Sequence, residues 1–126
     1  MKKGFILTVL LLSLAISVFG CAAGLSADAS EKDVADLARG FVETSPTYGF
    51  DGMSDTLKIV GSQQNGEAWA ITFEFQSTHG GYGDRTGQMV TQAITPHTVK
   101  VTVEAGQVTA AVIDGVWDEM AQQTIV

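Results

Sequence analysis

The stretch Glu67-Ala-Trp-Ala-Ile-Thr-Phe-Glu-Phe-Gln76 decides the fold, because large apolar residues occupy every second position along most of it. In an extended chain, successive side chains point to opposite faces. One face therefore carries Trp69, Ile71, Phe73 and Phe75, and the other carries Ala68, Ala70, Thr72, Glu74 and Gln76. This pattern is typical of an antiparallel strand with one face buried and the other in water.

Further strands are predicted on both sides of this stretch. Before it, residues 57–64 form an extended run, and Asn65-Gly66 follows as a predicted type I′ hairpin turn, which needs positive φ at both central residues. After it, residues 77–87 form a glycine-rich loop, and residues 88–104 are predicted to be extended. Pro96 interrupts this second run, so it marks a sheet edge or a bulge.

The end of the chain is predicted to return as one more strand. Ala105-Gly106 forms a second tight turn, and Val108 to Ile113 is the last extended run before Asp114-Gly115 ends it. Residues 116–126 carry no clear pattern. Within them, Trp117 has two interpretations: it closes the open end of the sheet, or it is an exposed anchor for a partner, a role that tryptophan often fills.

A helix is predicted before the strands. Ser30 is a favourable N-cap, and acidic residues in the first turn complement the helix dipole. Helical spacing produces one apolar stripe, formed by Val34, Leu37, Ala38, Phe41 and Val42. Ser45-Pro46 ends the helix, because the residue before proline is disfavoured in the α region. We therefore predict a helix at about 31–44 and a loop over residues 45–54.

Together these elements predict a single α+β domain over residues 30–126, with one N-terminal helix packed on a four-stranded antiparallel meander sheet. The order of elements resembles that of cystatin-like and PepSY-like domains, in which a helix packs across a curved sheet. The phrases Phe73-Glu-Phe-Gln-Ser-Thr-His-Gly-Gly-Tyr-Gly-Asp-Arg85 and Ile94-Thr-Pro-His97 look like a family of uncharacterised small exported prokaryotic proteins. That second resemblance implies no activity.

The first part of the chain is predicted to direct export. Residues 1–20 read as a signal peptide, with two lysines, an apolar run and a small residue before the cleavage point. Val18-Phe19-Gly20-Cys21 resembles the lipobox of prokaryotic lipoproteins. The resemblance implies cleavage before Cys21 and a lipid on its thiol, with residues 21–29 as a tether. The alternative is a secreted protein with a free cysteine.

Composition narrows the class of partner. Residues 21–126 hold five basic side chains against fourteen acidic ones, which gives a net charge of −9. Nucleic-acid binding is excluded, because phosphates require a basic face. The same charge opposes adhesion to anionic lipid, so the lipid on Cys21 is the predicted membrane contact. We expect an exported, membrane-anchored protein that faces outside the cytoplasm and carries no cofactor.

The loop His79-Gly80-Gly81-Tyr82-Gly83-Asp84-Arg85 is the densest candidate site. It places an imidazole, a phenol, a carboxylate and a guanidinium within seven residues. Its glycines would let the backbone approach a ligand closely, although a long hairpin connection needs glycines for its turns alone. His79, Tyr82, Asp84 and Arg85, with His97 from the following strand, are the candidate binding residues. The alternative is a purely structural loop, stiffened by a contact of Asp84 with Arg85 or Tyr82.

Three functions remain open. The leading hypothesis is a non-enzymatic binding module in the cell envelope, which contacts a protein or small ligand through the 77–87 loop and the nearby sheet edge. The first alternative is a metal-dependent or hydrolytic enzyme that uses His79, Asp84 and His97, although their spacing matches no metal motif. The second is a hydrolase inhibitor of cystatin-like architecture that inserts a hairpin tip.

Overall fold

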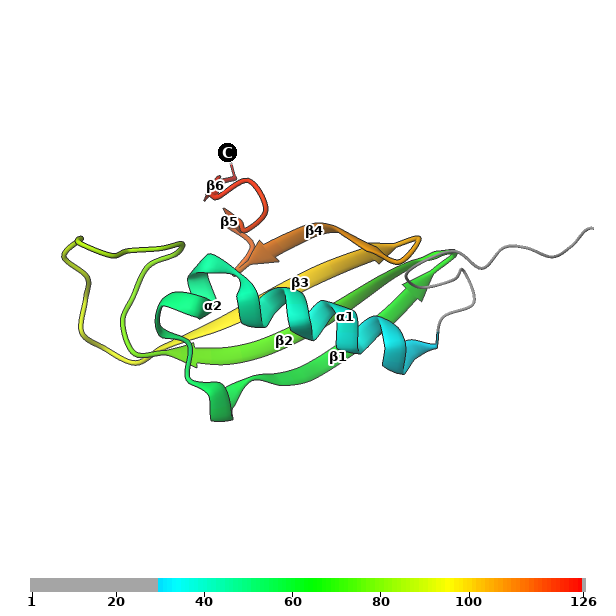
Figure 1. Ribbon diagram of the computed structural model, residues 1–126, viewed down its shortest axis with the longest axis horizontal. Coiled ribbons are helices and arrows are strands. Elements are labelled where there is room, and N and C mark those ends of the chain that lie inside the picture. The colour runs from blue at the N-terminus through cyan, green and yellow to red at the C-terminus, as the bar shows by residue number, and fades with distance from the viewer. Residues whose placement is uncertain (1–29, 126) are drawn as a thin grey trace, which may run out of the picture.

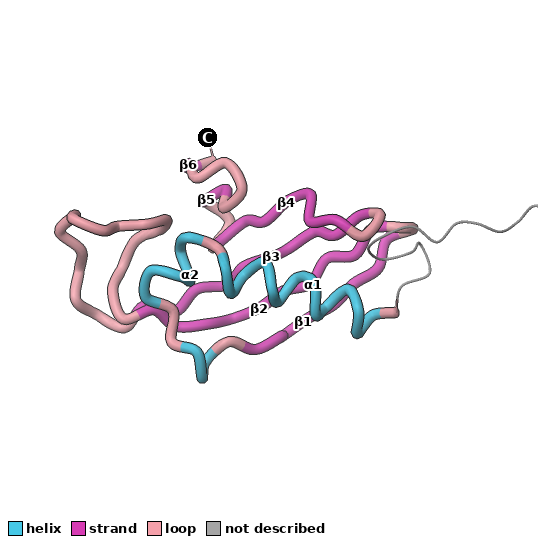
Figure 2. Tube along the Cα trace, viewed as in Figure 1, coloured by secondary structure: helices cyan, strands magenta, loops and turns pink. Residues whose placement is uncertain are grey.

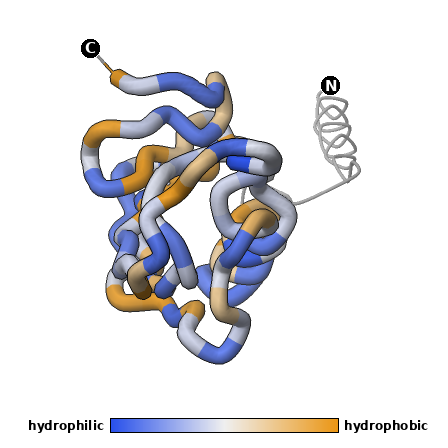
Figure 3. Tube along the Cα trace, turned by 90° about the vertical axis from the view of Figure 1, so that its left-hand side faces the viewer, coloured by the Kyte–Doolittle hydropathy of each residue, from blue (hydrophilic) through white to orange (hydrophobic). Residues whose placement is uncertain are grey.

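A computed structural model describes residues 30–125; the predicted signal peptide, tether and Cys21 lie outside this range. Helix α1, Glu31–Thr44, crosses one face of an antiparallel sheet (Figure 1). Figure 3 views the molecule along its long axis and shows helix and sheet as two layers. The predicted α+β class is therefore correct. No helix within the described residues is both long enough and apolar enough to cross a membrane.

Helix α1 has the bounds that the apolar stripe and its cap predict. The Ser30 side chain accepts a hydrogen bond from the backbone N–H of Asp33 at 3.2 Å, which satisfies one of the free amides of the first turn. Val34, Ala38 and Val42 are buried against the sheet. The cap and the stripe therefore begin the helix and orient it.

The segment after α1 differs from the prediction. Residues 46–51 form a second helix, α2 (Pro46–Asp51), followed by a single 3₁₀ turn, η2 (Ser54–Thr56), where a loop was expected. Pro46 ends α1 and also begins α2, because its fixed φ and missing N–H suit the first turn of a helix. Tyr48 of α2 packs edge-on against Phe75, with ring centroids 5.1 Å apart.

The sheet has six strands rather than four, and each pairs antiparallel with the next (Figure 2). Their bounds are β1 Lys58–Asn65, β2 Ala68–Ser77, β3 Thr95–Glu104, β4 Gln107–Ile113, β5 Trp117–Asp118 and β6 Gln123–Thr124. The first four form the predicted meander. The prediction missed β5 and β6 because a two-residue strand is too short to show a period of two.

The core lies between α1 and one face of the sheet. Ile71, Phe73 and Phe75 of β2 are at most 2% exposed, as the alternating pattern predicts. They meet Val99, Val101 and Val103 of β3, each of which pairs with a β2 residue of the same face. Burial of such large side chains contributes about 1.5–3 kcal/mol each, so this face dominates the stability of the domain.

Both predicted hairpin turns occur, but one is displaced by a residue. Asn65 pairs with Ala68, so the two-residue loop is Gly66-Glu67, and of these only Gly66 has positive φ, at 63°. The prediction of a type I′ turn centred on Asn65-Gly66 is therefore wrong. At the second turn, Ala105 and Gly106 both have positive φ, 51° and 76°.

The connection from β2 to β3 is longer than predicted, because residues 88–94 are not extended strand. The loop therefore spans Thr78 to Ile94 and leaves the sheet at one end (Figure 1). Pro96 lies within β3 and pairs with Gln76, whereas β4 pairs with β3 only from Val99 onward. Pro96 thus has a strand neighbour on one side only, which agrees with its prediction as an edge position.

Candidate functional site

Arg85 fastens the predicted binding loop internally. Its side chain is 3% exposed, and its guanidinium donates to the Gly83 carbonyl through Nε at 2.9 Å and to the Gly80 carbonyl through Nη1 at 2.8 Å. These bonds curl the loop around a single side chain. Gly81 permits this approach, because a Cβ atom at its position would lie 2.8 Å from Arg85 Cδ.

The same guanidinium joins the loop to α2. Arg85 Nη2 donates to the Thr47 carbonyl at 3.1 Å and to Asp51 Oδ1 at 3.0 Å, and its Cζ lies 4.6 Å from the centroid of the Phe50 ring. The Asp51 side chain is 4% exposed. We call this set, Arg85 with Gly80, Gly83, Thr47, Phe50 and Asp51, the Arg85 network. It holds the loop and α2 as one unit, so Arg85 is not directed toward a ligand.

His79 joins the opposite side of Asp51. The His79 backbone N–H donates to Asp51 Oδ2 at 2.8 Å, and its Nδ1 lies 3.2 Å from the same oxygen. The Thr78 hydroxyl lies 2.9 Å from this Nδ1. The buried Asp51 carboxylate therefore orients both the histidine and the arginine of the loop.

Tyr82 and His97 meet at a second carboxylate, that of Asp114. Asp114 Oδ2 accepts from the Tyr82 hydroxyl at 2.9 Å and lies 2.7 Å from His97 Nδ1, while Oδ1 accepts from the Thr98 backbone N–H at 2.8 Å. Burial and then the bond to Asp114 raise the pKa of Tyr82 to about 12. The Tyr82 ring also stacks on the Trp117 ring of β5, with ring centroids 5.5 Å apart, so Trp117 packs against the loop.

The trio of His79, Asp84 and His97 is not assembled into one site. The two imidazoles belong to separate networks, around Asp51 and Asp114, and Asp84 joins neither. Between residues 30 and 125, no group of three histidine, cysteine or acidic side chains is placed to hold a metal ion. The geometry therefore offers the metal-dependent alternative no ligand set in this part of the chain.

Among the candidate residues of the loop, only Asp84 is exposed and makes no hydrogen bond to another element. Its Oδ1 accepts from the Thr86 hydroxyl at 2.6 Å and from the Thr86 backbone N–H at 3.0 Å. These two bonds lower the pKa of Asp84. Asp84 lines a surface hollow of about 560 Å³ between the loop and α2, together with Thr44, Ser45, Pro46, Gly49, Phe50 and Thr86. We call this the Asp84 hollow.

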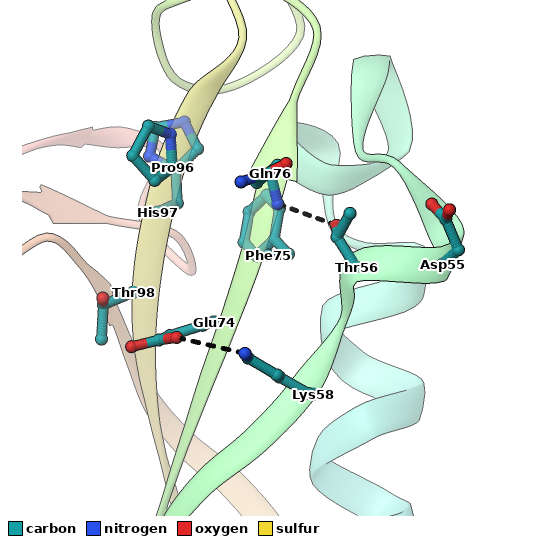
Figure 4. A pocket seen from close by; sticks show the side chains of 9 residues that line it. All are labelled: Asp55, Thr56, Lys58, Glu74, Phe75, Gln76, Pro96, His97 and Thr98. Atoms are coloured by element: carbon teal, nitrogen blue, oxygen red, sulfur yellow. Dashed lines mark hydrogen bonds and ion pairs between the residues drawn. The ribbon is translucent and has the colours of Figure 1, made fainter.

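A second hollow, of about 400 Å³, lies where β1 begins and η2 turns away from the sheet (Figure 4). A cross-strand row of Lys58, Glu74 and Thr98 crosses it, and Lys58 Nζ lies 4.0 Å from Glu74 Oε1. The Thr56 hydroxyl oxygen accepts from the Gln76 backbone N–H at 2.9 Å and closes the strand edge. We call this the sheet-edge hollow; it carries charges of both signs.

The distal half of the loop presents apolar side chains to solvent. Met89 is fully exposed and Ile94 is 60% exposed. Residues 86–99 contain no Asp, Glu, Lys or Arg, although the domain as a whole is strongly acidic. The loop therefore displays an uncharged, partly apolar segment to solvent, and Met89 lies beside Tyr82 and Gln88 in a surface depression separate from the Asp84 hollow.

Sequence reasoning missed the residues that organise this end of the molecule. The Thr47 hydroxyl donates to Glu119 Oε1 at 2.6 Å and accepts from the Gly83 N–H at 2.7 Å, and the Thr47 N–H donates to Glu119 Oε2 at 2.9 Å. Trp117 Nε1 also donates to Glu119. These partners lie up to 72 positions apart in the chain, and no local pattern marks them.

Two buried side-chain atoms among the described residues have no hydrogen-bond partner, Ser77 Oγ and His97 Nε2. They belong to neighbouring strands and to the buried face of the sheet. His97 therefore uses one ring nitrogen, toward Asp114, and is 2% exposed.

Comparisons of the chain with protein-family models, with curated proteins and with solved structures found no match in any of the three.

Proposed function

We propose that the chain is an exported lipoprotein, anchored through Cys21, whose α+β domain is a non-enzymatic binding module. One observation carries the binding part: hydrogen bonds to the rest of the domain hold the loop in place, whereas its outward side chains make no hydrogen bond to another element. Arg85, His79 and Tyr82 bond to Asp51 and Asp114, whereas Asp84 and Met89 face solvent. A loop already fixed in one conformation loses little conformational entropy on binding.

The contact surface of this proposal is the outward side of the loop with the two hollows at its root. The Asp84 hollow lies between loop and α2, and the sheet-edge hollow lies on the face of the sheet that α1 leaves uncovered. Both are open and mix apolar surface with hydroxyl and charged side chains, which suits a partner side chain or a small polar ligand better than a large apolar cofactor.

Capture from envelope membranes tests the binding surface. The full-length tagged chain is compared with Met89→Ser and Asp84→Asn variants, and Met120→Ser is the matched control, because Met120 is exposed on the C-terminal segment rather than on the loop. We expect the loop variants to reduce the amount of captured partner and the control to retain it. Equal capture by all four chains would exclude the loop as the contact surface.

The anchor is tested separately by Cys21→Ser. Loss of the acyl acceptor should give a chain that remains an unprocessed precursor or appears in the soluble fraction, because lipid attachment needs the thiol. Metabolic labelling with a radioactive fatty acid gives an independent readout. Membrane retention with normal processing in the Cys21→Ser chain would refute lipidation and leave the binding surface unaffected.

A further inference from the structure

The Asp84 hollow combines a fixed carboxylate with space beside it. Both bonds that Asp84 accepts from Thr86 go to Oδ1, and Oδ2 has no hydrogen-bond donor among residues 30–125. Thr86 thereby fixes the orientation of the carboxylate without using its second oxygen. No basic side chain lines the hollow.

The end of α1 adds negative potential to the same hollow. Thr44 and Ser45, at the C-terminal end of this 14-residue helix, line it, and the last turn of α1 contains no basic residue. The C-terminus of a helix carries a partial negative charge, which a cation complements. A cation in the hollow would therefore meet the Asp84 carboxylate and the negative end of the α1 dipole, where the Thr44 and Ser45 hydroxyls already donate to the Gly40 and Val42 carbonyls.

Nearby positive charge is already balanced. Arg85 lies beside Asp84 in the chain, but its guanidinium is buried and paired with Asp51 Oδ1 at 3.0 Å. The first amide of α2 is likewise matched, since Pro46 has no N–H and the Thr47 N–H donates to the Glu119 carboxylate. Neither group leaves an uncompensated positive charge against a cationic ligand.

We infer that the Asp84 hollow binds an organic cation, an ammonium or guanidinium group carried on a hydrocarbon stem. The charged head would meet Asp84 Oδ2 and the C-terminal end of α1, while the stem would contact Pro46 and Phe50, which also line the hollow. Long cationic side chains commonly bury their methylene stems in this way. The inference rests on the proposed function and specifies the chemistry that its loop surface recognises.

The test is an NMR titration of the full-length chain in a nonionic detergent with N-acetyl-lysine methylamide. The amide signals of Gly49, Asp84 and Thr86 should shift saturably, with a Kd of about 1 mM for one such group. N-acetyl-norleucine methylamide has a comparable stem without the charge, so it should cause no saturable shift. Cadaverine is titrated in parallel: tighter binding of the capped lysine indicates a protein side chain as the natural ligand, and tighter binding of cadaverine indicates a free amine.

Two matched variants identify the carboxylate. Asp84→Asn keeps an oxygen that accepts from Thr86 and removes the charge, and it should weaken the lysine probe by about fivefold, as expected for one exposed ion pair. Asp55→Asn removes the same charge from the sheet-edge hollow and should leave binding unchanged. Equal binding of the norleucine probe, no saturable shift with either amine, or an unaffected Asp84→Asn chain would each overturn the inference. None of these results would alter the capture experiment, so the proposed function would stand or fall independently.

Discussion

Arg85 Nη2 and Asp51 Oδ1 lie 3.0 Å apart, with side chains that are 3% and 4% exposed. A buried pair of this kind is costly to break, because the remaining charge stays out of water. The pair joins the loop to α2, two elements that the chain separates by more than 30 residues. It therefore determines where the loop lies.

Replacing Arg85 should destabilise the domain strongly. Arg85→Met removes four hydrogen bonds and leaves Asp51 buried without a cation, so we expect a loss of about 3–5 kcal/mol in the free energy of unfolding, measured by urea denaturation. Lys32→Met is the control, since it breaks an ion pair with Asp36 that is exposed on α1, and it should have little effect. Similar losses in the two variants would contradict the assigned role of Arg85.

Position 83 requires glycine for two reasons: its φ is positive, and neighbouring side chains leave no room for a Cβ atom. Its φ is 74°, and a Cβ atom there would lie 3.0 Å from Gln122 Oε1 and 3.2 Å from Trp117 Cζ2. Gly87 has φ of 81° with no atom within 4 Å of the corresponding position. Gly87→Ala should cost about 1–2 kcal/mol of unfolding free energy from strain alone, and Gly83→Ala about 1–3 kcal/mol more from crowding. Equal losses would show that the C-terminal segment does not press on Gly83.

Removal of a buried hydroxyl group should destabilise the domain at Thr47 but not at Ser77. Thr47→Val removes the hydroxyl that bonds Glu119 and Gly83, and leaves both partners buried, so a loss of about 1–3 kcal/mol is expected. Ser77→Ala removes a hydroxyl without a partner, and its effect should be neutral or stabilising. Thermal unfolding of the two single variants gives the comparison, and a large loss in Ser77→Ala would reveal an unrecognised bond.

The raised pKa of Tyr82 predicts that the domain loses stability at alkaline pH. Its pKa is raised to about 12 in the folded chain from an ordinary value of 10.0, so folding favours the protonated phenol. The stabilisation is fully present below pH 10 and is lost as the pH rises toward 12. Tyr82→Phe should flatten the stability curve over this range, measured by urea denaturation at successive pH values. A tyrosinate absorbance change for Tyr82 centred near pH 10 would contradict the assignment.

The sequence predicted the elements that local chemistry specifies. Ser30 marks the start of α1, and the alternation around Phe73 marks the buried face of β2, because each signal lies within a few residues of its effect. It did not predict α2, since Pro46 both ends one helix and begins another. The four-strand count was wrong because β5 is defined by its pairing with Ile113 rather than by a pattern of its own.

The candidate site was predicted only in part, for a related reason. The loop was identified by the density of polar groups, but composition does not indicate whether a side chain faces a ligand or the protein. Arg85 and His79 face Asp51, and Tyr82 faces Asp114; neither acid was among the predicted site residues. Contacts between such distant positions depend on the completed fold, and periodicity carries no information about them.

The order of the strands has a consequence for biogenesis. Each of the six strands pairs with its neighbour in the chain, so the sheet is built from local contacts, which form quickly. The hydrogen bond between Thr47 and Glu119 instead joins two residues that lie 72 positions apart in the chain. A growing chain can thus form its hairpins before its C-terminal residues are available. The Thr47 hydroxyl that accepts from Gly83 of the loop reaches Glu119 only when the last few residues are present, so a truncated chain would keep the strand pairs and lose this support of the loop.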